Sequence, residues 1–271
     1  MTNFKISNII YLLKIFTIFL YGKNIIPNRI IPKKLKKNFV TGKIFYFKRK
    51  IKYSNKGYFY VNPLPSQQEL NSYYKNYYWE WLTSGSKMDV GINRRDLEHY
   101  KLLKEYCPEL YDSKSKILNF GAGDGGISHL FWNNKSHVVN IDPSPMNFDY
   151  PERWEQHNTI FEITSDNSFD LIYGSHSLHL VSDIKLIYEK IIGLLKPNGY
   201  IFWEIPNGQN PANCGCNYKI KAAHTYYLTR KFFKNDAKFK VILNQLNTPG
   251  TIQEINSDLL GRNIRYLGKK I

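Results

Sequence analysis

The pattern of hydrophobic and polar positions changes near residue 116. From there on, short apolar runs alternate with longer amphipathic stretches, which is typical of a parallel sheet whose strands are joined by helices. The pattern predicts strands at 116–120, 137–141, 159–163, 169–173 and 199–205, helices at 126–133, 183–195 and 229–235, and closing strands at 238–244 and 263–268. The expected fold class is therefore α/β.

Upstream of residue 116 the pattern predicts an irregular series of elements. Aromatic-rich runs at 44–47 and 57–61 indicate short strands. Ser66 is followed three residues later by Glu69, a capping box that opens a helix to about Tyr78, and a second helix is expected at 93–106. Aromatic residues crowd 73–81. Two interpretations stay open for them: a helix packed on the domain, or a lid whose rings stack on a sugar or an adenine.

Basic charge is concentrated at the N-terminus. No Asp or Glu precedes Glu69, whereas 14 of the 38 Lys and Arg residues do. An expected apolar helix at 8–21 contains Lys14 and is shorter than the roughly 20 residues that span a bilayer. It could lie on a membrane surface, dock on the domain or a partner, or belong to the core. We therefore separate a basic extension, 1–62, from a domain at 63–271 with a helical lid region at 63–110. Residues 8–52 are candidates for peripheral contact with a membrane or another polyanion; a solvated basic face is the alternative.

The cysteines place limits on compartment and metal content. Three cysteines, an odd and low number, argue against a disulfide framework and suit a reducing compartment. A cytoplasmic location is expected, with attachment to the inner face of the membrane left open. Cys214-Gly-Cys216 has no second ligand pair at finger-like spacing, so no metal site is expected.

A glycine-rich turn follows the first strand of the alternating region. The segment Ile117–Gly126 reads ILNFGAGDGG. Glycine tolerates positive φ and has no side chain, so the backbone can turn sharply and approach a ligand at the carboxyl end of a parallel strand. The N-terminus of the following helix then faces the ligand. Alone, this turn indicates a nucleotide-like cofactor, because dinucleotide-binding domains share it.

Three further segments extend the pattern. Val138–Pro145 (VVNIDPSP) places Asp142 at the tip of the second strand, about 20 residues after the glycines, where a carboxylate accepts hydrogen bonds from ribose hydroxyls. Ser168–Asp183 and Leu194–Asn207 read SFDLIYGSHSLHLVSD and LLKPNGYIFWEIPN. Together with the glycine turn, they resemble the class I S-adenosylmethionine-dependent methyltransferases, in particular the small-molecule and glycan-modifying branch. The resemblance covers roughly 116–207.

The resemblance implies a Rossmann-like, seven-stranded, mostly parallel sheet and S-adenosylmethionine as cofactor. Carried over by position, the glycines would lie against the methionine part and Asp142 would hold the ribose. The predicted cofactor-binding residues are Asn119, Gly121, Ala122, Gly123, Gly125, Asp142, Pro143 and Ser175. Asn119 departs from the family, which usually carries an acidic residue there. His179-Leu180 also stands where the family often has Glu-His.

Three histidines are candidates for catalysis. A hydroxyl acceptor needs a base to take its proton, whereas an amine needs only to be neutral. His176 follows the fourth strand at the edge where such folds bind ligands; His179 and His224 are the other candidates. For the latter two, a structural role is the competing interpretation.

The acceptor is expected to be a sugar, a nucleotide-sugar or a surface-glycan precursor, in the context of polysaccharide biosynthesis. The region Pro63–Tyr78, followed by Gly85–Arg95, resembles the part ahead of the fold in methyltransferases encoded with surface-polysaccharide genes. Gly174–Ser177 replaces the Asn/Asp-Pro-Pro-aromatic segment of nucleobase methyltransferases, so nucleic acid is the less favoured partner. The alternatives are an RNA methyltransferase tethered by the basic N-terminus and a catalytically inactive cofactor-binding homologue.

Overall fold

Two sheets and the helices packed on them make up the part of the chain that the computed structural model describes. That part comprises residues 49–78, 92–112, 115–143, 155–213, 215, 224–234, 236–248, 254–255 and 257–271, so the expected helix at 8–21 and strand at 44–47 lie outside it. The strands are β1 Lys50–Ser54, β2 Tyr58–Asn62, β3 Lys116–Phe120, β4 His137–Ile141, β5 Glu155–His157, β6 Phe169–Ser175, β7 Leu195–Pro206, β8 Tyr226–Leu228, β9 Phe239–Asn247 and β10 Asn263–Lys270. The α-helices are α3 Gln67–Tyr73, α5 Arg94–Tyr106, α6 Glu109–Asp112, α7 Gly126–Asn133, α8 Ile184–Leu194 and α9 Arg230–Lys234. None of the helices described here is long and apolar enough to cross a bilayer.

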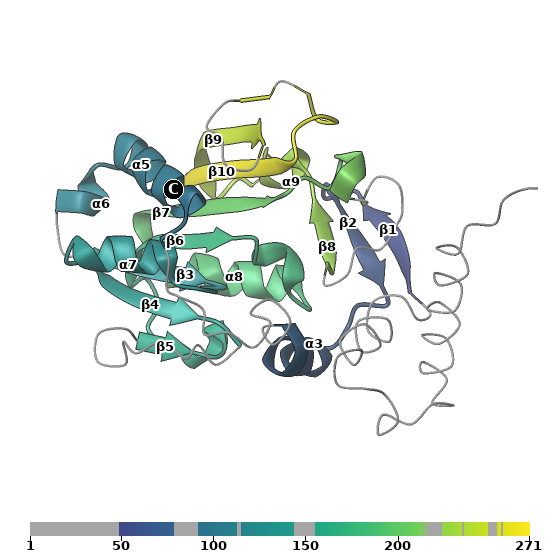
Figure 1. Ribbon diagram of the computed structural model, residues 1–271, viewed down its shortest axis with the longest axis horizontal. Coiled ribbons are helices and arrows are strands. Elements are labelled where there is room, and N and C mark those ends of the chain that lie inside the picture. Colours follow the sequence, from purple (N-terminus) through teal and green to yellow (C-terminus); the bar gives the residue numbers. More distant parts are fainter. Residues whose placement is uncertain are drawn as a thin grey trace, which may run out of the picture.

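The larger sheet has seven strands in the order β5-β4-β3-β6-β7-β10-β9 (Figure 1). Strands β5, β4, β3, β6 and β7 run parallel, and β10 is antiparallel to both of its neighbours. The predicted Rossmann-like, mostly parallel fold of seven strands is thus confirmed. Because parallel strands share one direction, their carboxyl ends meet along a single edge, which is where ligands bind in such sheets.

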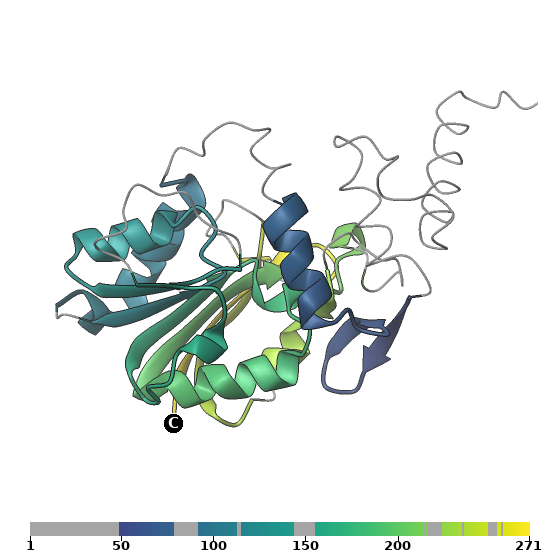
Figure 2. The same ribbon diagram turned by 90° about the horizontal axis from the view of Figure 1, so that it is seen from below.

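Helices cover both faces of this sheet (Figure 2). Strand residues alternate between the faces, as the period of two requires. Leu118 and Ile172 lie in a buried cluster with the apolar side of α8, whereas Ile117 and Leu171 lie in a second cluster with α5 and α7. The strands are therefore apolar on both faces, which explains their nearly continuous hydrophobic sequence.

Several local predictions are confirmed. The capping box of α3 is present, with the Ser66 side chain accepting from the backbone of Glu69 and the Glu69 side chain accepting from the backbone of Ser66. The helix gives way to a π-helical turn at Tyr74–Tyr78. The Lys-Pro-Asn-Gly segment interrupts strand pairing, because β6 pairs with Leu195 and then directly with Tyr200.

The prediction of a strand at 159–163 is wrong. That segment is a 3₁₀ turn at Ile160–Glu162, opened by the side chain of Thr159, and the edge strand is β5, earlier in the chain. Ile160 and Ile163 are both buried in the cluster under α8. Residues three apart lie on one face of a 3₁₀ turn. In the sequence, the same apolar residues resemble a short buried strand, because short apolar runs do not distinguish the two structures.

A smaller sheet lies beyond the carboxyl ends of the main strands. It consists of the hairpin β1–β2 and β8, which pairs antiparallel with β2. The strand expected at 57–61 is β2, whereas β1 was not predicted because Ile51 is its only buried residue. Helix α3 stands between this hairpin and the edge of the main sheet (Figure 2).

Candidate functional site

The glycine turn folds back on two neighbouring segments. Gly121 and Gly123 have φ of 72° and 56°, which L-residues with side chains rarely adopt. The backbone N–H groups of Gly121 and Ala122 both donate to the carbonyl of Ile141, at 2.7 and 3.0 Å. A Cβ on Gly121 would lie 2.3 Å from Cβ of Ser177, whose hydroxyl donates to the carbonyl of Phe120 at 2.6 Å. The ends of β3, β4 and β6 are thereby drawn together.

Asp142 is bonded directly to this turn. Its Oδ2 accepts a hydrogen bond from the backbone N–H of Gly123 at 3.0 Å, and its side chain is largely buried at the tip of β4. This bond holds the carboxylate in place, while a carboxylate has acceptor capacity for several further donors. Asp142 thus lies beside the glycine turn, at the position where the sequence predicts a ribose-binding carboxylate.

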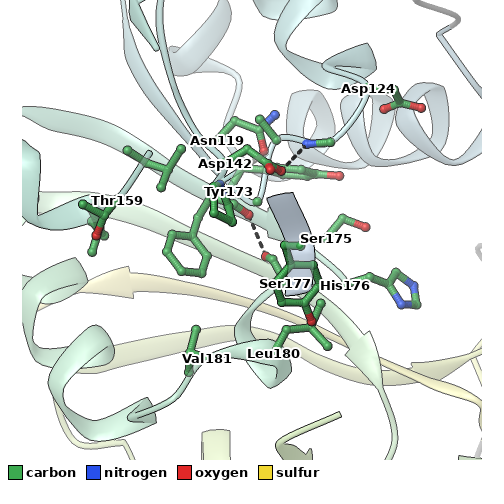
Figure 3. A pocket seen from close by; sticks show the side chains of 18 of the residues that line it. Asn119, Asp124, Asp142, Thr159, Tyr173, Ser175, His176, Ser177, Leu180 and Val181 are labelled. Atoms are coloured by element: carbon green, nitrogen blue, oxygen red, sulfur yellow. Dashed lines mark hydrogen bonds between the residues drawn. The ribbon is translucent and has the colours of Figure 1, made fainter. Parts of the chain in front are cut away.

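A cavity of about 460 Å³ opens at this edge of the sheet (Figure 3). Eight predicted site residues line it: Asn119, Gly121, Ala122, Gly123, Asp142, Pro143, Ser175 and His176. Thr159 and His176 lie at opposite ends, with Asp142 between them (Figure 3). Gly125, His179 and His224 are not among the lining residues. Gly125 instead caps α7 with a φ of 72°.

Asn119 belongs to a buried polar chain behind the cavity. Its Nδ2 donates to Oγ of Ser128 at 2.7 Å, and that hydroxyl donates to Oδ1 of Asn140 at 2.7 Å. The chain fixes the orientation of the amide, leaving Oδ1 as the acceptor of Asn119. The residue therefore brings an acceptor but no negative charge to the place where the family usually has a carboxylate.

The three predicted catalytic histidines form a row that leads away from the cavity. The rings of His176 and His179 have centroids 6.2 Å apart, and those of His179 and His224 are 4.5 Å apart. Only His176 reaches the cavity, whereas the other two are buried. His176 also has a φ of 54°, a strained backbone that concentrates at functional sites.

A buried carboxylate, Glu204 on β7, accepts hydrogen bonds from several side chains beside His176. Arg265 donates to it through Nε and Nη2 at 3.0 and 2.7 Å, and His99 through Nε2 at 2.9 Å. Burial would raise the pKa of Glu204, but the hydrogen bonds from His99 and Arg265 and the positive charge of Arg265 outweigh it and hold the pKa well below its ordinary value. Its Oε1 lies 3.9 Å from Nε2 of His176.

The same network extends to the cavity through Tyr173. Burial lowers the pKa of His99, so its ring is neutral and donates from Nε2 to Glu204. Nδ1 of His99 must then accept, and the hydroxyl of Tyr173 lies 2.7 Å from it. Tyr173 lines the cavity, so the buried ion pair also sets the direction of a hydroxyl at its wall.

Sequence reasoning missed several lining residues that are far from the glycine turn in the chain. Arg95 and Asp96 come from α5, and Gln67 and Asn71 from α3. Asp96 also caps α5, its Oδ2 accepting from the backbone N–H of Asn93 at 3.1 Å. Burial raises the pKa of Asp96 to about 6, against the hydrogen bond from Asn93, which lowers it. Adjacent opposite charges at the start of a helix are too common to have revealed a site.

Known proteins share this fold. A family model described as a methyltransferase domain matches residues 93–238. The 1,6-didemethyltoxoflavin-N1-methyltransferase of Burkholderia thailandensis, solved with 1,6-didemethyltoxoflavin and S-adenosylhomocysteine, is 15% identical over 82% of this chain and 99% of its own, with a TM-score of 0.56. A S-adenosylmethionine-dependent methyltransferase of Archaeoglobus fulgidus is 16% identical over 72% of this chain and 100% of its own, with a TM-score of 0.50. No curated protein sequence matches the chain.

The family model spans more than half of the chain and includes the glycine turn, Asp142 and the row of histidines. The structural matches, at such low identity, support the fold alone. Motifs, fold and family model agree, and the chain belongs to the methyltransferase-domain family as a class I S-adenosylmethionine-dependent methyltransferase.

Proposed function

We propose that this methyltransferase transfers the methyl group of S-adenosylmethionine to a hydroxyl of a sugar, a nucleotide-sugar or a glycan precursor. The observation that carries the proposal is the arrangement of the cavity. Asp142 lies at its centre, a pair of opposite charges lies beside the glycine turn, and uncharged hydrogen-bonding side chains line the part formed by α3. These three parts match the ribose of the cofactor, the amino-acid end of the cofactor and the hydroxyl-rich acceptor.

The residues around the glycine turn fit the cofactor. Positive φ at Gly121 and Gly123 brings the backbone to the cavity wall. A side chain at Gly121 would collide with Ser177. Asp142 would hold the ribose hydroxyls. The part lined by Asn158, Thr159 and Ile160, at the far end from His176, would take the adenine. A cavity of about 460 Å³ is in the range of pockets for ligands of this size.

Arg95 and Asp96 would bind the amino-acid end of the cofactor. That end carries a carboxylate and an ammonium group, and the two residues offer the complementary guanidinium and carboxylate beside the turn. Oδ2 of Asp96 is used by the helix cap, which fixes the carboxylate and leaves Oδ1 for a ligand. Asp96 would thus supply the negative charge that Asn119 lacks.

The acceptor side is polar but carries few charges. Gln67 and Asn71 are hydrogen-bonded to each other at 2.7 Å, which orients both amides, and Ser175 also lines the cavity. Amides and hydroxyls are suited to sugar hydroxyls, because they can both donate and accept. These contacts support a neutral, hydroxyl-rich acceptor.

His176 would act as the general base. When bound, the cofactor supplies an activated methyl group, because its sulfonium sulfur is a good leaving group that keeps the carbon–sulfur electron pair. The acceptor oxygen would bond to the methyl carbon and lose its proton to His176. Since Nε2 of His176 lies 3.9 Å from the Glu204 carboxylate, an N–H on Nε2 is favoured, and Nδ1 is then the nitrogen that would take the proton.

Transfer of radiolabelled methyl groups to cell fractions tests this function. Purified protein and labelled S-adenosylmethionine are incubated separately with surface-glycan, nucleotide-sugar and RNA fractions. We expect label in a sugar-containing fraction, loss of that label with His176→Ala, and retention with His137→Ala, which changes an exposed histidine on β4. Label in RNA alone would overturn the proposal in favour of an RNA methyltransferase. Tight cofactor binding without label anywhere would favour an inactive homologue.

A further inference from the structure

A second cavity, of about 730 Å³, lies between the hairpin β1–β2 and helix α9. It shares no lining residue with the cofactor cavity. Its walls include Tyr53 and Phe59 from the hairpin, Arg230, Lys231 and Lys234 from α9, and Asp258. The methyltransferase reaction uses none of these residues.

Hydrogen bonds and close packing fix the two walls relative to each other. The carbonyl of Gly57, in the hairpin turn, accepts from both the backbone N–H and Oγ1 of Thr229, at 3.1 and 2.7 Å. A Cβ on Gly57 would lie 2.7 Å from the backbone nitrogen of Phe232, so the turn lies directly against α9. A site with fixed walls loses little freedom when a ligand binds.

The cavity carries an unbalanced positive charge. Arg230 lies 3.8 Å from the carboxylate of Asp258. Lys231 and Lys234 are exposed, and no carboxylate of the described residues lies within 4.0 Å of either ammonium group. The sequence has no Asp or Glu before residue 69 and none from 205 to 235, so Asp258 is the acidic residue among those that line this cavity.

An aromatic ring faces solvent beside these cations. Tyr53 is 49% exposed and packs at 4.9 Å against the ring of Phe59, which holds it in place. An aromatic face of this kind packs well against a sugar or base ring, while lysine ammonium groups bind phosphate oxygens. We propose that this cavity binds a phosphate ester, with Lys231 and Lys234 on the phosphate and Tyr53 against the attached ring.

Calorimetric titration of the full chain at low ionic strength tests the proposal. The probes are glucose 1-phosphate, inorganic phosphate and vesicles containing phosphatidylglycerol, which separate a soluble sugar phosphate from a lipid headgroup. The test variant is Lys231→Gln/Lys234→Gln. The control is Lys101→Gln/Lys104→Gln, which removes the same charge from exposed lysines with the same spacing on α5.

We expect wild type and control to bind glucose 1-phosphate alike, and the test variant to bind at least ~10-fold more weakly. Tyr53→Ala should weaken glucose 1-phosphate binding but leave inorganic phosphate unchanged. Binding to the vesicles alone, lost in the test variant, would assign the phosphate to a lipid headgroup. The proposal is overturned if none of the three probes binds. It is also overturned if the test and control variants lose binding equally, since that would reflect net charge.

Discussion

The backbone N–H of Gly123 donates a hydrogen bond to Oδ2 of Asp142 across 3.0 Å. This contact joins the ends of β3 and β4 and makes the glycine turn and the acidic residue one structural unit. The bond restrains both groups before a ligand arrives, and preorganised groups lose less freedom on binding. We therefore expect changes in this unit to affect both cofactor binding and local stability, and variants must be compared on both.

Gly121→Ala tests the packing of the turn. The added Cβ would lie 2.3 Å from Cβ of Ser177 at a φ of 72°, so we expect a loss of about 1–3 kcal/mol in the free energy of unfolding and loss of cofactor binding. Urea denaturation measures the first effect. Gly193→Ala in α8 is the control: its nearest contact would be Asp166 Oδ1 at 3.7 Å, and we expect a neutral or slightly stabilising change. Equal stability of the two variants would contradict this account.

Asp96→Asn tests the proposed ammonium contact. S-adenosylmethionine should bind about 10–100-fold more weakly to the variant, because a charge-assisted bond is lost. 5′-Methylthioadenosine, which lacks the amino and carboxyl groups, should bind both proteins alike. An equal loss for the two ligands would mean that Asp96 acts only through the cap of α5.

The pH dependence of cofactor binding follows from the same residue. The pKa of Asp96 is raised to about 6 in the protein without ligand, so the carboxylate becomes protonated and neutral below that pH. Affinity for S-adenosylmethionine should then decrease as the pH falls below 6, by up to about tenfold per unit. The affinity for 5′-methylthioadenosine should stay flat over the same range, and parallel curves for the two ligands would count against the contact.

Glu204→Gln tests the buried ion pair. Arg265 would be left charged and uncompensated in the interior, so we expect a loss of about 3–5 kcal/mol in the free energy of unfolding. Glu189→Gln, which removes an exposed carboxylate on α8 at 4.0 Å from Lys185, should change it by less than about 0.5 kcal/mol. Similar values for the two variants would show that the network contributes little.

Acid should destabilise the wild type in two stages. Burial lowers the pKa of His99 from its ordinary 6.5, so the unfolded chain binds its proton first and stability is lost as the pH falls below 6.5. The pKa of Glu204 is also lowered, so its contribution is present above its ordinary 4.5 and is lost as the pH falls further toward the folded-state pKa. Melting temperatures of wild type and Glu204→Gln against pH measure both stages. The variant should lack the second.

The sequence predicted the elements whose pattern is set locally. Strands on the sheet interior are apolar on both faces, and α7 lies where its periodicity predicts, at 126–133. The edge strand β5 was misplaced because its residues are largely polar, and β1 was missed because it is half exposed. These edges are determined by neighbours in space rather than by their own composition.

The site divides in the same way. The glycine turn and Asp142 were predictable, because they follow two neighbouring parallel strands at a characteristic spacing along the chain, and the carboxyl ends of such strands lie side by side. Arg95, Asp96 and the α3 amides were not, since packing of α3 and α5 against the strand ends places them there and no local pattern encodes it. Glu204 gave no signal either, because a single carboxylate in an apolar strand reveals its role only through Arg265 and His99.

We propose that the chain binds S-adenosylmethionine at the carboxyl edge of the sheet through Asp142. Isothermal titration of S-adenosylmethionine into the wild type and Asp142→Ala tests it most directly, with circular dichroism to establish that both are folded. We expect saturable binding by the wild type and at least ~10-fold weaker binding by Asp142→Ala, because the ribose loses a charged acceptor. Absent binding by the folded wild type, or equal affinity of the two proteins, would contradict it.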